Sequence, residues 1–237
     1  MKKNFTVIAA GGLGTRLKDY EQNKHTKVLI PIGNYSMISR QIIQLKSWNL
    51  KNFVVITNPE FHELIKNDLK QNFPTEKFEY VIQEEQLGIA HALKQAEPYV
   101  DEGSKVSFVL GDNFIGSNPF LDSDSDNPNS HAFLTLKEVS NPQDFGIAEI
   151  KRKKIINLIE KPKKYISNLA ILGFYQYDYS CFALIDSLNK SDRGEFEITA
   201  LNQRYLEMGL IKYNINNSWW IDAGTPERIK ELENKLI

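Results

Sequence analysis

The chain has 237 residues, which is enough for one large domain or two small ones with a buried core. Its 29 basic and 30 acidic side chains give a net charge of −1, so no general field attracts it to nucleic acid or to a membrane surface. The only cysteine, Cys181, excludes an internal disulfide and a thiolate metal cluster.

Strand-like runs alternate with helical periodicity through the first half of the chain. The strand-like runs lie at 4–10, 52–57, 78–83 and 105–112. Apolar residues spaced as on one face of a helix occupy 38–45, 61–69 and 89–96. Because strands and helices alternate, the sequence predicts βαβ crossovers and an α/β fold with a mainly parallel, mixed central sheet flanked by helices.

The pattern becomes richer in strands after residue 130. Strand-like runs are predicted at 131–139 and 169–177, and helices at 180–189, 196–208 and 226–236. Thr225 followed by Pro226 is typical of an N-cap and a first helical residue. The basic run "KRKK" at 151–154 separates two strand-like stretches, which favours a solvated hairpin turn over a docking patch.

Two further segments limit the class of protein. The patch "DSDSDNPNS" at 122–130 has Asn127 where a calcium loop needs glycine and Phe133 where it needs a bidentate glutamate, so a surface loop is expected. The N-terminal apolar run ends in glycines after a few residues, as a first strand does and a signal peptide does not. No stretch approaches the ~18 uncharged apolar residues of a membrane span. The sequence therefore predicts a soluble, cytoplasmic protein.

A glycine-rich turn, "AAGGLGTRL" at 9–17, follows the first predicted strand. Glycines allow close backbone approach, and successive N–H groups in such a turn form an anion nest. Leu17 stands where the dinucleotide fingerprint needs glycine, and the Gly-Lys-Ser/Thr ending of a Walker loop is absent. The turn alone is also compatible with a purely structural role. Arg16 favours phosphate, because a guanidinium beside the nest offers a planar fork to phosphate oxygens.

Several charged residues stand where burial would be costly without a partner. Asp112 ends a predicted buried strand, and Asp222 follows two tryptophans. Lys27 precedes the apolar "VLIPI", which is compatible with a lysine held beside the first strand and also with a simply exposed one. Two carboxylates together with phosphate oxygens suit Mg²⁺, although each alone is equally explained as an N-cap or a turn residue. Glu160 and Lys161, before Pro162, are by themselves typical of an exposed ion pair at a strand end.

Taken in order, these segments resemble the sugar-phosphate nucleotidylyltransferases, and among them the branch that acts on dTTP and glucose-1-phosphate. The resemblance covers residues 4 to about 230 and rests on "AAGGLGTRL", "KVLIPIG", "VIQEEQLGIAHAL", "VLGDN", "DFGIAEI", "LIEKP", "NLAILGFYQYD", "RGEFEIT" and "WWIDAGTPE". It implies a Rossmann-like nucleotidyltransferase fold with a β-rich insertion that binds the sugar. The implied organisation is a single domain over 1–237, with a nucleotide-binding half at 1–115 and a sugar-phosphate-binding half at 116–237.

The resemblance also implies a role for each matching residue. The loop residues that would wrap the triphosphate are Ala10, Gly11, Gly12, Gly14, Thr15 and Arg16. Lys27 would act with Arg16 as a catalytic residue and neutralise the reacting phosphates. Gln83 would read the pyrimidine through an amide free to rotate, together with the backbone N–H of Gly88. The metal ligands for Mg²⁺ would be Asp112 and Asp222. The residues lining the sugar-1-phosphate site would be Gly146, Glu160, Lys161 and Ile171.

The implied reaction needs no general base, because a phosphate monoester is already mostly dianionic at neutral pH. The four scattered histidines are accordingly expected to be structural or exposed. The segment "KDYEQNKHT" departs from the family pattern, so Lys27 is assigned by its relation to "VLIPIG", with Lys24 as the alternative. Three alternatives of function stay open: a UTP-dependent or a CTP-dependent enzyme of the same fold, and a non-catalytic nucleotide-sugar-binding protein. The family is compatible with a homo-oligomer and requires neither nucleic acid nor membrane.

Overall fold

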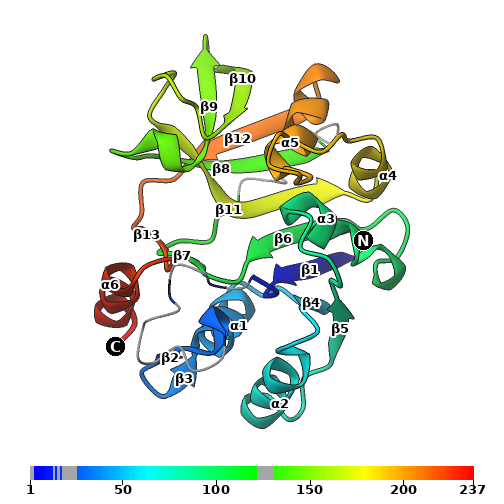
Figure 1. Ribbon diagram of the computed structural model, residues 1–237, viewed down its shortest axis with the longest axis vertical. Coiled ribbons are helices and arrows are strands. Elements are labelled where there is room, and N and C mark those ends of the chain that lie inside the picture. The colour runs from blue at the N-terminus through cyan, green and yellow to red at the C-terminus, as the bar shows by residue number, and fades with distance from the viewer. Residues whose placement is uncertain (1–2, 13, 15–16, 18–25, 122–130) are drawn as a thin grey trace.

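The computed structural model describes residues 3–12, 14, 17, 26–121 and 131–237. Figure 1 shows a sheet running through the centre of the molecule, with α1 and α2 at one end and the β9–β10 hairpin at the other. The predicted surface loop at 122–130 and the predicted site residues Thr15 and Arg16 lie outside the described residues, as does Lys24.

The elements of the first half are β1 (Asn4–Ala9), the 3₁₀ helix η2 (Lys27–Leu29), β2 (Pro31–Ile32), β3 (Tyr35–Ser36), α1 (Met37–Ser47), β4 (Phe53–Thr57), α2 (His62–Asn72), β5 (Phe78–Ile82), α3 (Ile89–Lys94), η3 (Glu97–Tyr99), β6 (Lys105–Leu110) and β7 (Asn113–Ile115). Those of the second half are β8 (Ala132–Glu138), η4 (Pro142–Asp144), β9 (Gly146–Lys151), β10 (Lys154–Glu160), β11 (Leu169–Asp178), α4 (Cys181–Asp186), α5 (Ile198–Glu207), β12 (Ile211–Ile215), β13 (Trp220–Asp222) and α6 (Pro226–Leu236). The predicted strands and helices are confirmed, with ends that differ by a few residues.

The central sheet is mixed, as predicted, and has the strand order β10-β9-β11-β6-β1-β4-β5. The four strands from the first half, β6, β1, β4 and β5, pair in parallel. Strand β11 joins β6 antiparallel, and beyond it β8 and β9 also pair antiparallel with β11. Strand β12 is the exception in the second half, because it pairs parallel with β8.

Three of the four parallel strands, β1, β4 and β6, are buried on both faces, whereas the edge strand β5 is only partly buried. Alternate residues of β1 show this, because Val7 packs in one hydrophobic cluster with α3, α4 and α5, whereas Ile8 packs in another with α1 and α2. A strand covered on both faces needs a nearly continuous apolar sequence, which "NFTVIA" supplies. This packing makes the strand ends rigid supports for the segments that follow them.

The C-terminal helix returns to the first half of the chain. Helix α6 contacts β2, and its Ile229 and Leu232 share a third cluster with Ile32 and Met37. The side chain of Thr225 accepts a hydrogen bond from the backbone N–H of Arg228, which confirms the predicted N-cap.

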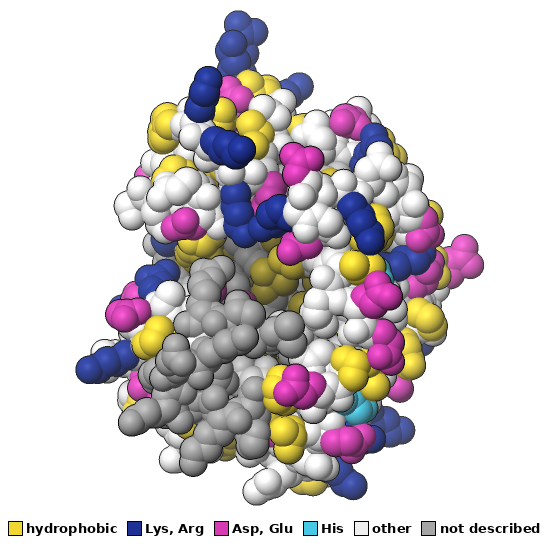
Figure 2. All heavy atoms as spheres, in the orientation of Figure 1, with side chains coloured by type: hydrophobic (Ala, Val, Ile, Leu, Met, Phe, Trp, Pro, Cys, Tyr) yellow, Lys and Arg dark blue, Asp and Glu magenta, His cyan; other side chains and the backbone are white. Residues whose placement is uncertain are grey.

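The "KRKK" segment forms the predicted hairpin turn between β9 and β10. Arg152 and Lys153 at its tip have φ values of 49° and 61°, the left-handed geometry that suits a two-residue hairpin loop. Figure 2 shows Lys and Arg side chains gathered at this end of the molecule. Within the described ranges, no helix has both the length and the apolar composition needed to cross a membrane.

Candidate functional site

The segments that follow the parallel strands converge at one edge of the sheet. From β1 the chain continues to β4 and β5 on one side, whereas β6 returns to the other side of β1. The point where the strand order reverses is where open α/β sheets bind ligands, in the crevice outside the carboxyl ends of the strands. The glycine turn after β1 and Asp112 after β6 adjoin this point, because Ala9 is paired with Leu110.

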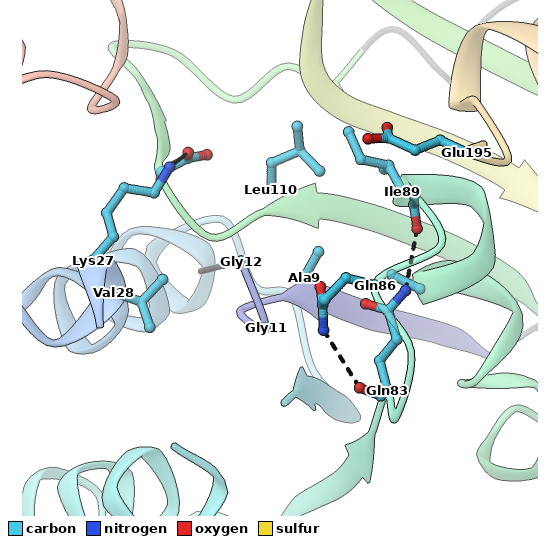
Figure 3. Close-up of a pocket in the computed structure, with 13 residues that line it drawn as sticks. Ala9, Gly11, Gly12, Lys27, Val28, Gln83, Gln86, Ile89, Leu110 and Glu195 are labelled. Carbon is cyan, nitrogen blue, oxygen red and sulfur yellow. Dashed lines mark hydrogen bonds and ion pairs between the residues drawn. The ribbon is translucent and has the colours of Figure 1, made fainter. Parts of the chain in front are cut away.

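A pocket of about 250 Å³ lies at this crevice. Its lining residues come from the ends of β1, β5 and β6, from η2, from the start of α3 and from Glu195. Figure 3 shows Lys27 and Val28 on one side of the pocket and Gln83, Gln86 and Ile89 on the other. In Figure 2 a hollow in the middle of the face has hydrophobic side chains at its floor and charged side chains along its rim. The pocket therefore has a charged side and a side lined by amides.

The glycine turn borders the pocket through Gly11 and Gly12. A Cβ on Gly11 would lie 3.0 Å from the carbonyl carbon of Thr57, so this position has no room for a side chain. Gly14 has a φ of +59°, and a Cβ there would lie 3.1 Å from Cβ of Lys27. Asn58 holds the turn by donating from Nδ2 to the Gly11 carbonyl at 2.9 Å. Ala10 is fully buried and donates its N–H to the sheet, so it supports the turn without lining the pocket.

Lys27 and Asp112 form an ion pair within the pocket. Both side chains are 17% exposed. Burial acts to raise the pKa of Asp112, but the Lys27 ammonium and a hydrogen bond from Asn113 outweigh it and hold the pKa below its usual value. Asp112 is therefore an anion at neutral pH. The pair places one positive and one negative charge at the reversal point of the sheet.

Asn113 is a buried residue that forms hydrogen bonds to Asp112 and to two further strands. Sequence reasoning did not identify it. Its Nδ2 donates to Oδ1 of Asp112 at 2.8 Å. Its Oδ1 accepts from the backbone N–H of Gly173 at 3.2 Å and from Nε1 of Trp220 at 2.9 Å. Gly173 has no side chain because a Cβ there would lie 2.7 Å from Cγ of Asn113. Asn113 thus joins β7, β11 and β13 and orients the carboxylate of Asp112.

The pairing of β13 with β7 brings the backbone of Asp222 close to that of Asp112, but Asp222 lines a different cavity. It is paired with Asn113 between β13 and β7, and the N–H of Ala223 donates to the Asp112 carbonyl at 2.8 Å. Asp222 borders a cavity of about 480 Å³ that Arg228 and Lys137 also line. Within the described residues, no group of three or more histidine, cysteine, aspartate or glutamate side chains is placed to hold a metal.

Gln83 occupies the amide side of the pocket and is 3% exposed. Its Nε2 donates to the Gly88 carbonyl at 3.2 Å and contacts Nδ1 of His91 at 3.0 Å. The expectation that this amide rotates freely is therefore wrong, because its nitrogen is already bonded. Gly88 has a φ of +102°, and a Cβ there would lie 2.7 Å from the Phe196 carbonyl, so only glycine fits.

The residues expected to hold the sugar form a second cluster. A Cβ on Gly146 would lie 3.1 Å from Oε2 of Glu160 and 3.5 Å from Cδ1 of Ile171. Oε2 of Glu160 accepts a hydrogen bond of 2.6 Å from the hydroxyl of Thr199, a residue that sequence reasoning missed. Lys161 lies beside them, with its Nζ 3.9 Å from Oε1 of Glu160. The structure thus brings together Gly146, Glu160, Lys161 and Ile171.

Arg193 links this cluster to the pocket. Its guanidinium lies 3.6 Å from Oε1 of Glu160 and 3.4 Å from Oε2 of Glu195, which lines the pocket. Glu197 accepts hydrogen bonds of 2.8 Å from Nη2 of Arg193 on both carboxylate oxygens. The sequence signal was the "RGEFEIT" segment, whose acids are equally typical of a helix start. The cation therefore became visible as part of the site only in the folded chain.

Comparison with known proteins identifies the family. The family model described as "Nucleotidyl transferase" matches residues 5–237. The low-salt glycan biosynthesis nucleotidyltransferase Agl11 of Haloferax volcanii is 34% identical over 98% of this chain, and the glucose-1-phosphate thymidylyltransferase of Neisseria meningitidis is 30% identical over 95%. This chain covers 65% of the first of these relatives and 80% of the second.

A solved structure agrees with these relatives. A Bacillus anthracis protein with a provisional assignment as glucose-1-phosphate thymidylyltransferase, in complex with a sucrose, superposes with a TM-score of 0.88. The two are 34% identical, and the match covers 98% of this chain and 94% of that one. The chain spans only about half of other curated relatives, such as the bifunctional GlmU protein of Methanococcus maripaludis, of which it covers 54%. Since the family model and the relatives both match nearly the whole chain, this protein belongs to the nucleotidyl transferase family.

Proposed function

We propose that the protein transfers a thymidylyl group from dTTP to glucose-1-phosphate, giving dTDP-glucose and pyrophosphate. The observation that carries the proposal is the arrangement of the pocket. Gln83 and Gly88 lie on one side, Lys27 and Asp112 on the other, and the cluster around Glu160 is joined to the pocket wall through Arg193. Such a site offers separate contacts to a base, to its phosphates and to a sugar. The relatives named as thymidylyltransferases support the same reading.

In the proposed reaction an oxygen of the sugar phosphate attacks the α-phosphorus of the triphosphate. The bond from the α-phosphorus to the bridging oxygen breaks, and its electron pair leaves on pyrophosphate. The nucleophile is already anionic, so the protein's task is to bring two polyanions together and align them. Lys27 on one side and Lys161 with Arg193 on the other supply positive charge from described residues. Arg16, which lies outside them, is proposed to add a further cation at the triphosphate.

Asp112 and Asp222 are proposed to hold Mg²⁺. The fit rests on the donor chemistry, because Asp112 is kept anionic and Asn113 fixes the direction of its carboxylate. Mg²⁺ in nucleotide enzymes binds one or two carboxylates and takes its other ligands from phosphates and water, which suits a site to which these two aspartates contribute. When bound, the ion would reduce the negative charge of the phosphates. Lys27 would then exchange its partner Asp112 for a phosphate oxygen.

The geometry of Gln83 supports a base of the uracil type. Because Nε2 is committed to Gly88, the oxygen Oε1 is the part of the amide left to bind a ligand. Thymine and uracil present an N–H donor at position 3, whereas cytosine presents an acceptor there. An acceptor facing an acceptor costs about 1–3 kcal/mol, so CTP is expected to be disfavoured about ten- to a hundredfold. The methyl group that separates thymine from uracil contributes only ~1 kcal/mol on burial, so UTP is expected as a second substrate.

The cluster around Glu160 is proposed to bind the hexose. The Glu160 side chain is 26% exposed, and its Oε2 accepts a hydrogen bond from Thr199, which supports a carboxylate held in place with lone pairs available to a ligand's hydroxyl groups. A Cβ on Gly146 would come close to both Thr199 and Glu160, so glycine at this position leaves room for these two side chains. Lys161 and Arg193 at the same cluster suit the phosphate end of the sugar phosphate.

A pyrophosphate-release assay tests the proposal by crossing dTTP, UTP, CTP and ATP with a panel of sugar-1-phosphates. The expected result is the highest kcat/KM for dTTP with glucose-1-phosphate, followed by UTP. A preference for CTP or ATP would refute the roles given to Gln83 and Gly88. Failure of every pair to release pyrophosphate would instead favour a nucleotide-sugar-binding protein that has lost catalysis.

A further inference from the structure

His91 contacts the amide that the proposed function uses to read the base. It lies in the first turn of α3, and its Nδ1 is 3.0 Å from Nε2 of Gln83. The same Nε2 donates to the Gly88 carbonyl at 3.2 Å. A carbonyl oxygen can only accept, so the contact with Gly88 identifies this end of the amide as its nitrogen. For Nδ1 of His91 to accept from the same nitrogen, the ring proton must lie on Nε2.

We propose that His91 is a positioning residue for base selection, whose neutral Nδ1 holds the Gln83 amide with its oxygen available to the nucleobase. The inference rests on the proposed function, because it explains how that site distinguishes uracil-type bases from cytosine. Gly88 and His91 provide two acceptors for the two N–H groups of one amide nitrogen. These two acceptors oppose a rotation of the Gln83 amide. Such a rotation would turn the amide nitrogen toward the base and would favour the binding of cytosine.

The surroundings of His91 favour its neutral form. Its ring stacks on Phe196 at 6.2 Å between centroids, and Nε2 of Gln95, which also donates to the His91 carbonyl at 3.3 Å, lies 3.2 Å from the ring Nε2. Amide nitrogens thus face both ring nitrogens, and neither offers an acceptor to the additional proton of a charged ring. The proposed tautomer is the one in which Nδ1 accepts and Nε2 does not. The charged groups that face it are Glu85 and Lys190. Burial is the largest influence on the pKa of His91 and lowers it, the charge of Lys190 lowers it further, and Glu85 opposes both; the net pKa lies below 6.5.

Protonation would remove the acceptor. A charged His91 carries a hydrogen on Nδ1, which then faces the hydrogens of the Gln83 nitrogen. Because the pKa of His91 lies below 6.5, the acceptor is present at neutral pH and is lost as the pH falls through that lowered value. Discrimination against cytosine should therefore be greatest near neutrality and should decline on the acid side.

The test compares UTP with CTP, which differ only on the edge of the base. Two quantities are measured between about pH 5.5 and 8: the ratio of equilibrium dissociation constants, and the ratio of kcat/KM for pyrophosphate release with glucose-1-phosphate. Ionisation of the phosphates is common to both nucleotides and cancels in each ratio, and the lower limit of the range keeps N3 of cytosine mostly unprotonated. The wild type should discriminate less at the acid end of this range.

Three variants separate positioning from general structure. His91→Phe keeps a ring beside Phe196 but removes the acceptor, so at neutral pH the ratio should fall about fivefold, the equivalent of one hydrogen bond. His91→Asn offers a carbonyl oxygen at a similar position without a titrating group, so it should restore discrimination and make it independent of pH. His131→Phe is the matched control, because His131 pairs with Asp178 on another part of the sheet, and its ratio should equal that of the wild type.

The outcomes distinguish the inference from the proposed function. A wild-type ratio that is flat with pH, or a His91→Phe ratio equal to that of the wild type, would overturn the positioning role even if the enzyme is fully active. Discrimination that depends on His91 in the binding experiment, without pyrophosphate release, would support the role while refuting the proposed reaction. Failure to bind either nucleotide would overturn both. Because the pH profile uses the unaltered protein, a variant that does not fold leaves the test intact.

Discussion

Replacing Asn113 with alanine should destabilise the protein far more than a typical polar substitution. Asn113 is 3% exposed, and its Oδ1 accepts from the Gly173 N–H and from Nε1 of Trp220. Alanine would leave both donors buried without a partner, and each stranded donor costs about 1–3 kcal/mol. The expected loss in the free energy of unfolding is therefore about 2–6 kcal/mol, a large part of the roughly 5–15 kcal/mol of a typical domain.

Equilibrium denaturation in urea measures this loss, and a double-mutant cycle assigns it. Trp220→Phe removes one of the two donors, so the loss caused by Asn113→Ala should be about 1–3 kcal/mol smaller in the Trp220→Phe background. Asn189→Ala, at an exposed position, serves as the control and should change stability by less than about 0.5 kcal/mol. A loss for Asn113→Ala as small as that of the control would refute the reasoning, as would strict additivity in the cycle.

Three further predictions concern the proposed reaction. Lys27→Ala should lower kcat for pyrophosphate release about 10²-fold or more, because the reacting phosphates lose a cation, while the circular dichroism spectrum stays unchanged. A mild effect of Lys27→Ala together with a severe effect of Lys24→Ala would show that the wrong lysine was assigned. Activity should disappear with a chelator and return with Mg²⁺. Asp112→Asn and Asp222→Asn should each be severely impaired in the same assay. Full activity without metal would show that neither carboxylate acts as a metal ligand in the reaction. Glu160→Ala should raise KM for the sugar phosphate about five- to 150-fold, with a much smaller effect on KM for the triphosphate, because the sugar's hydroxyl donors lose their acceptor; equal effects on the two KM values would leave Glu160 as a structural ion pair only.

Local sequence patterns were sufficient for the elements of the fold. Thr225 before Pro226 predicted the start of α6 because both the capping oxygen and the fixed φ of proline act within one turn of the chain. The apolar run of β1 predicted a strand buried on both faces because each face needs its own apolar residues. The "KRKK" turn was predictable for the same reason, since a hairpin loop is decided by its own residues and the two strands beside it.

The candidate site was predictable in its residue types but not in its contacts. Gly146, Glu160 and Ile171 were chosen from motifs that are separate in the chain, and only the pairing of β9 with β10 and β11 brings them within reach of one another. Thr199 joins them from α5, and the sequence did not predict its hydroxyl as part of the site because threonine is a common residue in a helix. Contacts of this kind depend on strand register and helix packing, which the whole sheet decides.

The amide of Gln83 shows most clearly what the sequence determined and what only the tertiary structure decided. The sequence alone determined that a polar residue stands at the end of a strand and precedes a glycine and a helix. It could not determine which way the amide points, because that depends on acceptors supplied by the Gly88 carbonyl and the His91 ring. The packing of α3 against the 195–197 segment sets those positions, through the hydrogen bonds of Phe196 with Leu87 and Ala90. Side-chain orientation at a buried polar site follows from the full set of its partners, and only the tertiary structure assembles that set.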